Sequence, residues 1–256
     1  MEEAGQHWSR DYFDEWYLRL FGKPDEDRTD HETAALCALL PPPPCRVLDA
    51  ACGFGRHAVR LASAGYDVVG VDSSPHQLSL AREAAEQRGV AAEFLQIDMA
   101  DMTFDRQFDA VLNLSTSWGY SDDDEENLET LRAMVHSLRP GGVFIMEIAH
   151  RDAIVAHYAS RDWRGLSDGT IVWISRSFDP VAGVNVVVHR WRTPDGSEYQ
   201  REHRVRLFTP TEIDRLFRAA GLVPTDWYDD FSLRTLRLGG SNHLLVRALA
   251  DEGLRH

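Results

Sequence analysis

The chain has 256 residues, and its 27 basic and 41 acidic residues give a formal net charge of −14. This charge repels a phosphate backbone, so we expect no nucleic-acid partner. No apolar run approaches the roughly 20 residues that cross a bilayer, so we expect no membrane partner. Three cysteines and an acidic start without a basic, apolar leader favour a reducing, cytoplasmic compartment.

Aromatic side chains recur near the amino terminus, in residues 7–21, at spacings that suit one face of a helix. They are Trp8, Tyr12, Phe13, Trp16, Tyr17 and Phe21. A tyrosine hydroxyl needs a partner when it is buried, so we predict that Tyr12 and Tyr17 face a ligand. The phenylalanines and Trp16 are expected to pack in the core. Four prolines at residues 41–44 then form a stiff spacer.

Residues 47–57 read as a buried strand that turns through glycines into a helix. Gly53 and Gly55 allow a ligand to approach the backbone closely. The next apolar run ends in Asp72, 19 residues after Gly53, where a carboxylate can accept both hydroxyls of a ribose. The pattern indicates a nucleotide site at the carboxyl edge of the first strand.

The segments that follow alternate between strand and helix patterns. Further strands are expected over residues 92–98, 108–114 and 142–148, and helices over residues 55–64, 75–88 and 122–138. Such alternation predicts a mostly parallel sheet with helices on both faces, which is an α/β fold.

The carboxyl-terminal part has a different pattern. Residues 171–178, 185–192 and 199–208 are rich in β-branched and aromatic residues and are separated by short turns, which predicts an antiparallel three-stranded meander. A capped helix over residues 209–220 and two strands, 223–228 and 243–248, then complete the main sheet.

Five signals in this order resemble the class I S-adenosylmethionine (SAM) dependent methyltransferases. They are residues 48–55, Asp72, Asp98, residues 108–109 and residues 138–142. The resemblance implies a Rossmann-like seven-stranded sheet, with Ala51 standing where many members have glycine. It divides the chain into a helical cap (1–44), a SAM-binding core (45–158), a β insertion used as a lid or homo-oligomer contact (159–208) and the end of the core (209–256).

The resemblance also implies which residues bind SAM. The implied positions are Asp49, Ala51, Gly53, Asp72, Asp98, Met99 and Leu114. Asp72 would hold the ribose hydroxyls and Asp98 the adenine amino group, with Met99 beside the ring. Asp49 and the backbone of the other three positions would surround the methionyl portion. Asp49 and Asp98 keep the alternative of simple helix or turn caps, which aspartate favours.

The whole chain is similar to small-molecule methyltransferases of natural-product and amino-sugar tailoring, including antibiotic N-methyltransferases. Residues 55–57 and 161–163 carry this similarity, together with Trp118 and Tyr120. We therefore expect a small-molecule acceptor, with amine nitrogen favoured over hydroxyl oxygen. Tyr12, Trp118 and Tyr120 are the candidate substrate walls.

Tyr17 and His150 are the catalytic candidates. His150 follows the fifth strand at the ligand-binding edge, where it could serve as the base that an alcohol acceptor needs. A lone histidine at a strand end is also often structural.

Several alternatives remain open. An oxygen methyltransferase with a histidine base and a non-catalytic SAM-binding protein both fit, whereas an NAD-dependent dehydrogenase fits poorly because a third glycine six positions after Gly53 is missing. The acids at residues 122–126 are read as the start of a helix, so no metal is expected. Arg201, Arg204 and Arg206 are expected to form a solvated or salt-bridged face.

Overall fold

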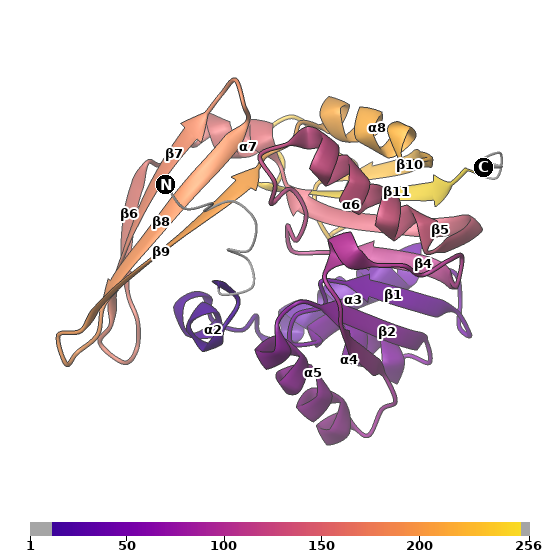
Figure 1. Ribbon diagram of the computed structural model, residues 1–256, viewed down its shortest axis with the longest axis horizontal. Coiled ribbons are helices and arrows are strands. Elements are labelled where there is room, and N and C mark those ends of the chain that lie inside the picture. The colour runs from indigo at the N-terminus through magenta and orange to yellow at the C-terminus, as the bar shows by residue number, and fades with distance from the viewer. Residues whose placement is uncertain (1–11, 252–256) are drawn as a thin grey trace.

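A computed structural model describes residues 12–251 of the chain. It has an α/β architecture with one seven-stranded sheet, helices on both faces, and a separate four-stranded antiparallel sheet (Figure 1). The predicted fold class is thus confirmed. None of the helices within residues 12–251 is long and apolar enough to cross a membrane.

The large sheet has the strand order β10-β11-β5-β4-β1-β2-β3. Its strands are β1 (Arg46–Ala50), β2 (Asp67–Asp72), β3 (Glu93–Gln96), β4 (Phe108–Asn113), β5 (Leu138–Ala149), β10 (Leu222–Tyr228) and β11 (His243–Ala250). Strands β1 to β5 run parallel, whereas β11 pairs antiparallel with both β5 and β10. The chain order reverses between β1 and β4, and open α/β sheets bind their ligands beyond the carboxyl ends of such strands.

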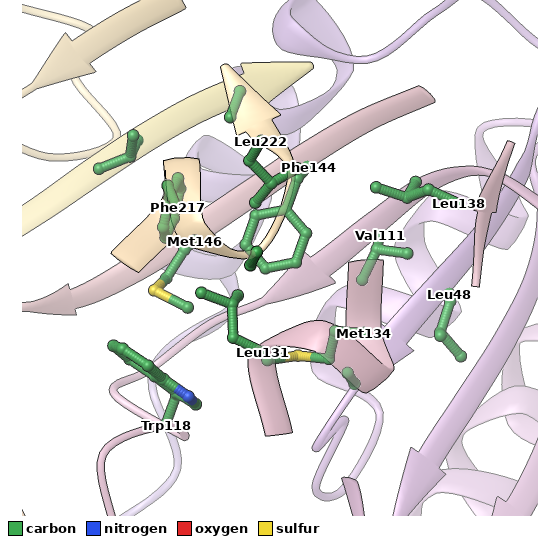
Figure 2. Close-up of a cluster of buried hydrophobic side chains, with 14 of the residues drawn as sticks. Leu48, Val111, Trp118, Leu131, Met134, Leu138, Phe144, Met146, Phe217 and Leu222 are labelled. Atoms are coloured by element: carbon green, nitrogen blue, oxygen red, sulfur yellow. The ribbon is translucent and has the colours of Figure 1, made fainter. Parts of the chain in front are cut away.

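Alternating side chains bury both faces of this sheet. Val47 lies in the core formed with α3 (Glu26–Leu39), α4 (Arg56–Ser63) and α5 (Pro75–Arg88). Its neighbour Leu48 lies in the opposite core, against α6 (Asp124–His136) and α8 (Pro210–Ala219). Figure 2 shows this second core, which includes the side chains of Leu131, Phe144 and Phe217.

The insertion has one strand more than predicted. Its strands are β6 (Arg161–Gly165), β7 (Ile171–Asp179), β8 (Val184–Arg192) and β9 (Glu198–Arg206), in that spatial order. The additional strand β6 pairs with β7 so that Trp163 lies opposite Trp173. Because β6 has three charged residues and no β-branched residue, its sequence gave no strand pattern.

Helix α2 (Glu15–Phe21) packs on the inner face of the insertion rather than on the large sheet. Leu20 lies among Val172, Ile174 and Trp191, and the ring of Trp16 is 5.2 Å from that of Trp191. In Figure 1, α2 lies between the two sheets. The expected packing of Trp16 is thus found on a different surface, while Trp8 falls outside the described residues.

Candidate active site

A cavity of about 890 Å³ opens beyond the carboxyl ends of β1, β2 and β4. This volume lies within the range of small-molecule and cofactor pockets. The cavity is lined by every position that the sequence assigned to the cofactor: Asp49, Ala51, Gly53, Asp72, Asp98, Met99 and Leu114. Tyr17, Trp118 and Tyr120 also line it. The fold therefore brings ten of the twelve predicted site residues to one cavity.

The turn from β1 into α4 forms the floor of the cavity. Ala51, Gly53 and Gly55 have φ angles of 62°, 55° and 74°, a region that favours glycine. A Cβ on Gly55 would lie 2.8 Å from the Cβ of Ala81, so only glycine allows α5 to pack here. Alanine at Ala51 adopts the left-handed conformation at a cost of about 1–2 kcal/mol.

Two acids stand at the ends of β1 and β2, the buried Asp49 and the half-buried Asp72. Asp72 accepts hydrogen bonds from the backbone N–H groups of Gly53 and Ser74, both at 2.8 Å, and burial raises the pKa of its carboxyl. Asp49 is only 2% exposed. Its burial, helped by the nearby charge of Asp72 and opposed by Arg56, raises its pKa to about 7. Asp49 is therefore poised to change charge close to neutral pH.

Asp98 forms the cap that was considered for it and also lines the cavity. Its Oδ1 accepts from the backbone N–H of Ala100 at 3.1 Å and so caps the short helix η1 (Met99–Asp101). The same residue lines the cavity, together with Met99. The sulfur of Met99 is held 3.2 Å from the amide nitrogen of Asn113.

Two arginines that the sequence analysis did not select, Arg28 and Arg56, also line the cavity. Both are bonded to the buried carboxylate of Glu32, and Arg56 donates to the hydroxyl of Ser115 at 3.1 Å. Burial opposes ionisation of Glu32, yet hydrogen bonds from His57 and the two arginines hold its pKa well below its usual range. The motif at residues 55–57 could have indicated that Arg56 belongs to the site. No sequence pattern around Arg28 indicates a site residue.

The opposite wall of the cavity is aromatic. Phe13, Tyr17 and Phe21 enter from the amino-terminal segment, and their rings follow one another at centroid distances of 4.8 and 4.9 Å. The ring of Phe13 also contacts that of Tyr120, at a centroid distance of 6.0 Å. The start of α6 adds four acidic residues to the cavity lining: Asp123, Glu125, Glu126 and Glu129.

Trp118 is a cavity residue and a core residue at once. It is 1% exposed, stacks on Phe208 at 4.6 Å and donates from Nε1 to the carbonyl of Asn127 at 2.8 Å. Figure 2 shows it at the edge of the core.

Two predicted residues lie away from the cavity lining, Tyr12 and His150. The Tyr12 ring packs 5.0 Å from that of His203, and its hydroxyl is 3.4 Å from Nδ1 of His189, both in the insertion. The same ring also contacts two residues of the cavity lining, at 5.4 Å from the ring of Phe13 and 6.0 Å from that of Tyr17. His150 is 5% exposed, forms a bridge with Phe208 and precedes α7 (Arg151–Ala156). His150 therefore lies in the protein interior beside Phe208 and is not part of the cavity lining. This position does not support His150 as a base.

The acids that precede and open α6 are held by arginines of β9. Arg204 binds Asp122, and Arg206 binds Asp124. Arg201 binds Asp14 at 2.6 Å. The salt-bridged interpretation of the three arginines is correct. Asp123 caps α6, and Asp124, Glu125 and Glu126 lie in its first turn, so the acidic run begins a helix as predicted. Among residues 12–251, no group of three or more histidine, cysteine or acidic residues is arranged to hold a metal.

Comparison with known proteins identifies the family of this chain. Residues 47–142 match the family model described as a methyltransferase domain. The chain is 31% identical over 193 residues to a glycine/sarcosine N-methyltransferase of Halorhodospira halochloris. The aligned region covers 73% of this chain and 68% of that protein. The chain belongs to the class I SAM-dependent methyltransferases.

Two further proteins are similar to this methyltransferase over most of its length. A dTDP-3-amino-3,4,6-trideoxy-alpha-D-glucopyranose N,N-dimethyltransferase of Streptomyces venezuelae is 28% identical, covering 83% of this chain and 89% of that protein. A SAM-dependent methyltransferase structure from Clostridium acetobutylicum has a TM-score of 0.78 at 18% identity, covering 92% and 96% of the two chains, which reflects a shared fold.

The residues of the cavity fit SAM. Its volume suits a cofactor together with a small acceptor. Gln77, 2% exposed and part of the lining, has an Oε1 atom without a hydrogen-bond partner in the protein. A polar ligand would satisfy such a buried acceptor.

Proposed function

We propose that this methyltransferase transfers the methyl group of SAM to an amine nitrogen of a small molecule. The observation that carries the proposal is the composition of the acceptor side: aromatic faces, a carboxylate rim and no available imidazole. His57 is the only histidine among the described residues that line the cavity, and its Nε2 is 2.9 Å from the Glu32 carboxylate. Burial also lowers the pKa of His57, so it is a weak base there.

We propose that Asp72 binds the ribose of the cofactor and that Asp98 and Met99 bind its adenine. Asp49 would pair with the ammonium group of the methionyl end. Arg28 and Arg56 add positive charge to the cavity and suit the carboxylate of that end, because guanidinium groups bind carboxylates in a fixed fork geometry. Bound SAM supplies an electrophilic methyl group on a sulfonium.

The protein's own contribution is alignment and the exclusion of water. The acceptor nitrogen must lie about 3–3.5 Å from the methyl carbon and in line with the sulfur. The rings of Phe13, Tyr17 and Tyr120 can enclose it and keep water out. Aromatic faces also stabilise a nearby cation by about 0.5–1 kcal/mol. The carboxylates at the start of α6 would attract an ammonium substrate, which then loses its proton to solvent before transfer.

The names of two relatives also support nitrogen. One is a glycine/sarcosine N-methyltransferase and one an amino-sugar N,N-dimethyltransferase. These small amines define a first set of acceptors to test.

A radiolabelled methyl-transfer assay tests the proposal. Glycine, sarcosine and a dTDP-amino sugar are offered beside matched hydroxyl compounds, namely glycolate and the corresponding dTDP-deoxysugar without the amine. We expect transfer to an amine only. Transfer to a hydroxyl compound alone would favour the oxygen methyltransferase alternative. SAM binding without transfer to any of a broad amine set would favour a non-catalytic SAM-binding protein.

We also propose that the outer face of the insertion joins two copies of this chain. Trp163 and Trp173 face each other across β6 and β7, and their exposed fractions are 68% and 44%. Arg192 lies opposite Glu198 on the same face, so a second copy in antiparallel orientation meets complementary charges. Sedimentation of the wild-type protein should give a dimer, and Trp163→Ser with Trp173→Ser should give a monomer. A monomeric wild type would overturn this assignment.

A further inference from the structure

The loop that follows β4 begins in a strained conformation. Ser115 and Thr116 have φ angles of 62° and 56°, in the left-handed region that residues with a Cβ rarely adopt. Two such residues in succession persist only where the surroundings hold them. The segment from Leu114 to Ser121 supplies seven of its eight residues, all except Thr116, to the cavity lining.

Glu147 on β5 is the residue that holds this start. Its Oε2 accepts the backbone N–H of Ser115 at 2.6 Å, and its backbone carbonyl accepts the N–H of Thr116 at 3.1 Å. Glu147 is only 5% exposed and does not line the cavity. Its other carboxylate oxygen forms an ion pair with His243 on β11. A buried charge is thereby paired on one side and hydrogen-bonded on the other.

The far end of the loop is fixed separately. The carbonyl of Gly119 accepts the backbone N–H of Arg206 at 2.7 Å, and Trp118 is anchored to Asn127. With the far end anchored to β9 and α6, the path between Leu114 and Gly119 depends on how the loop leaves β4. That path sets where Ser117, Trp118 and Tyr120 meet the acceptor.

We infer that Glu147 is a positioning residue: by holding Ser115 and Thr116 in the left-handed conformation, it places the acceptor wall against the cofactor site. The inference rests on the proposed acceptor role of this loop. Glu147 touches no lining residue other than Ser115 in these hydrogen bonds, and it acts through the backbone.

The test removes the hydrogen-bond acceptor and then removes the strain. Glu147→Leu cannot accept from Ser115, whereas Glu147→Gln can, through its amide oxygen. We expect the Ser115 amide to exchange with solvent at least tenfold faster in Glu147→Leu and within threefold of wild type in Glu147→Gln, followed residue by residue by NMR with S-adenosylhomocysteine bound. Glu147→Asp, one methylene shorter, keeps the charge beside His243 and should act in the same direction as Glu147→Leu.

Thr116 offers a matched control because its side chain is absent from the cavity lining. Thr116→Gly adopts the left-handed region without a steric penalty, whereas Thr116→Ala does not. When Thr116→Gly is combined with Glu147→Leu or Glu147→Asp, it should restore at least a third of the lost kcat/KM. This kcat/KM is measured for the amine that the transfer assay identifies. The alanine should restore none. The affinity for S-adenosylhomocysteine should stay within threefold throughout.

Unchanged Ser115 exchange in both Glu147→Leu and Glu147→Asp would overturn the inference, as would equal restoration by glycine and alanine. A parallel loss of cofactor affinity and activity would also overturn it, because it would mean that Glu147 acts on the fold as a whole. The exchange measurement needs no acceptor. If no amine is methylated, the proposed function fails. The exchange rate of the Ser115 amide still shows whether Glu147 holds the start of the loop.

Discussion

The backbone N–H of Gly53 donates to Oδ2 of Asp72 at 2.8 Å, which ties the glycine loop after β1 to the end of β2. The other carboxylate oxygen accepts from Ser74, which caps α5. Asp72 therefore orders two segments of the cavity floor before any ligand arrives.

Replacing Asp72 by alanine should weaken S-adenosylhomocysteine binding by about ten- to 150-fold. Hydrogen bonds to a charged group contribute about 1.5–3 kcal/mol, and 1.4 kcal/mol corresponds to a factor of ten. Asp72→Asn keeps one acceptor oxygen, so its affinity for S-adenosylhomocysteine should fall less than that of Asp72→Ala. Calorimetry measures both, with NAD as the control ligand that is expected not to bind. Wild-type affinity in the alanine variant would contradict the proposed ribose contact.

Cofactor affinity should depend on pH through Asp49. Its pKa of about 7 lies above its usual value, so the carboxyl is largely neutral below pH 7 in the unliganded protein. If an ammonium group binds the carboxylate, affinity for S-adenosylhomocysteine should fall up to about tenfold per pH unit as pH drops below 7. Calorimetry between pH 5.5 and 7.5 checks the slope. Asp49→Asn should abolish it, and an unchanged slope in that variant would assign it to another group.

The same shift makes a stability prediction with a defined sign. The unfolded chain releases the Asp49 proton near pH 4, whereas the folded protein keeps it up to about pH 7. The unliganded protein should therefore lose stability from this group as pH rises from about 4 to 7. The difference in unfolding free energy between wild type and Asp49→Asn, measured by denaturation across this range, reports it.

The cofactor half of the site was predictable because it depends on local sequence. Gly53, Asp72 and Asp98 each end or follow a strand, and parallel strands bring their carboxyl ends to one edge. The acceptor half of the site depends on whether α2 packs against the insertion or against the large sheet. The four-residue spacing of Tyr12 and Trp16 predicted one row on a helix, with Tyr17 in a neighbouring row. It could not predict that the insertion would cover the row of Trp16. Likewise, the anchoring of Trp118 in the core is a tertiary property.

Tyr17 and Tyr12 should respond differently to the same change. Tyr17 lines the cavity, so Tyr17→Phe should lower kcat or raise the acceptor KM several-fold, with SAM affinity within a few-fold. Tyr12 packs on His203 of the insertion, so Tyr12→Phe should leave acceptor kinetics within about twofold. Steady-state kinetics on the paired variants decides this, and equal losses would show that the segment acts as a unit.

His150 should be dispensable as a base. Because its side chain is buried away from the cavity lining, His150→Gln should retain methyl transfer within a few-fold and keep the same pH profile. A hundredfold loss of kcat together with a loss of the basic limb of the profile would restore its catalytic role. A lower melting temperature with normal kinetics would mark it as structural.

Methyl transfer should survive EDTA. The acids preceding and opening α6 are engaged by Arg204 and Arg206, and displacement at a sulfonium carbon requires no Lewis acid. Turnover measured with and without chelator, and after addition of magnesium, tests this. Loss on chelation that magnesium reverses would point to a site at Asp122 and Asp124.

Helix α2 contributes Trp16 and Leu20 to the core of the insertion and Tyr17 and Phe21 to the cavity. An insertion exchanged between related enzymes without this helix would lose its inner covering, and the recipient cavity would lose its shape. The two segments, separated by more than a hundred residues in the chain, should therefore be transplanted together in any attempt to alter acceptor choice.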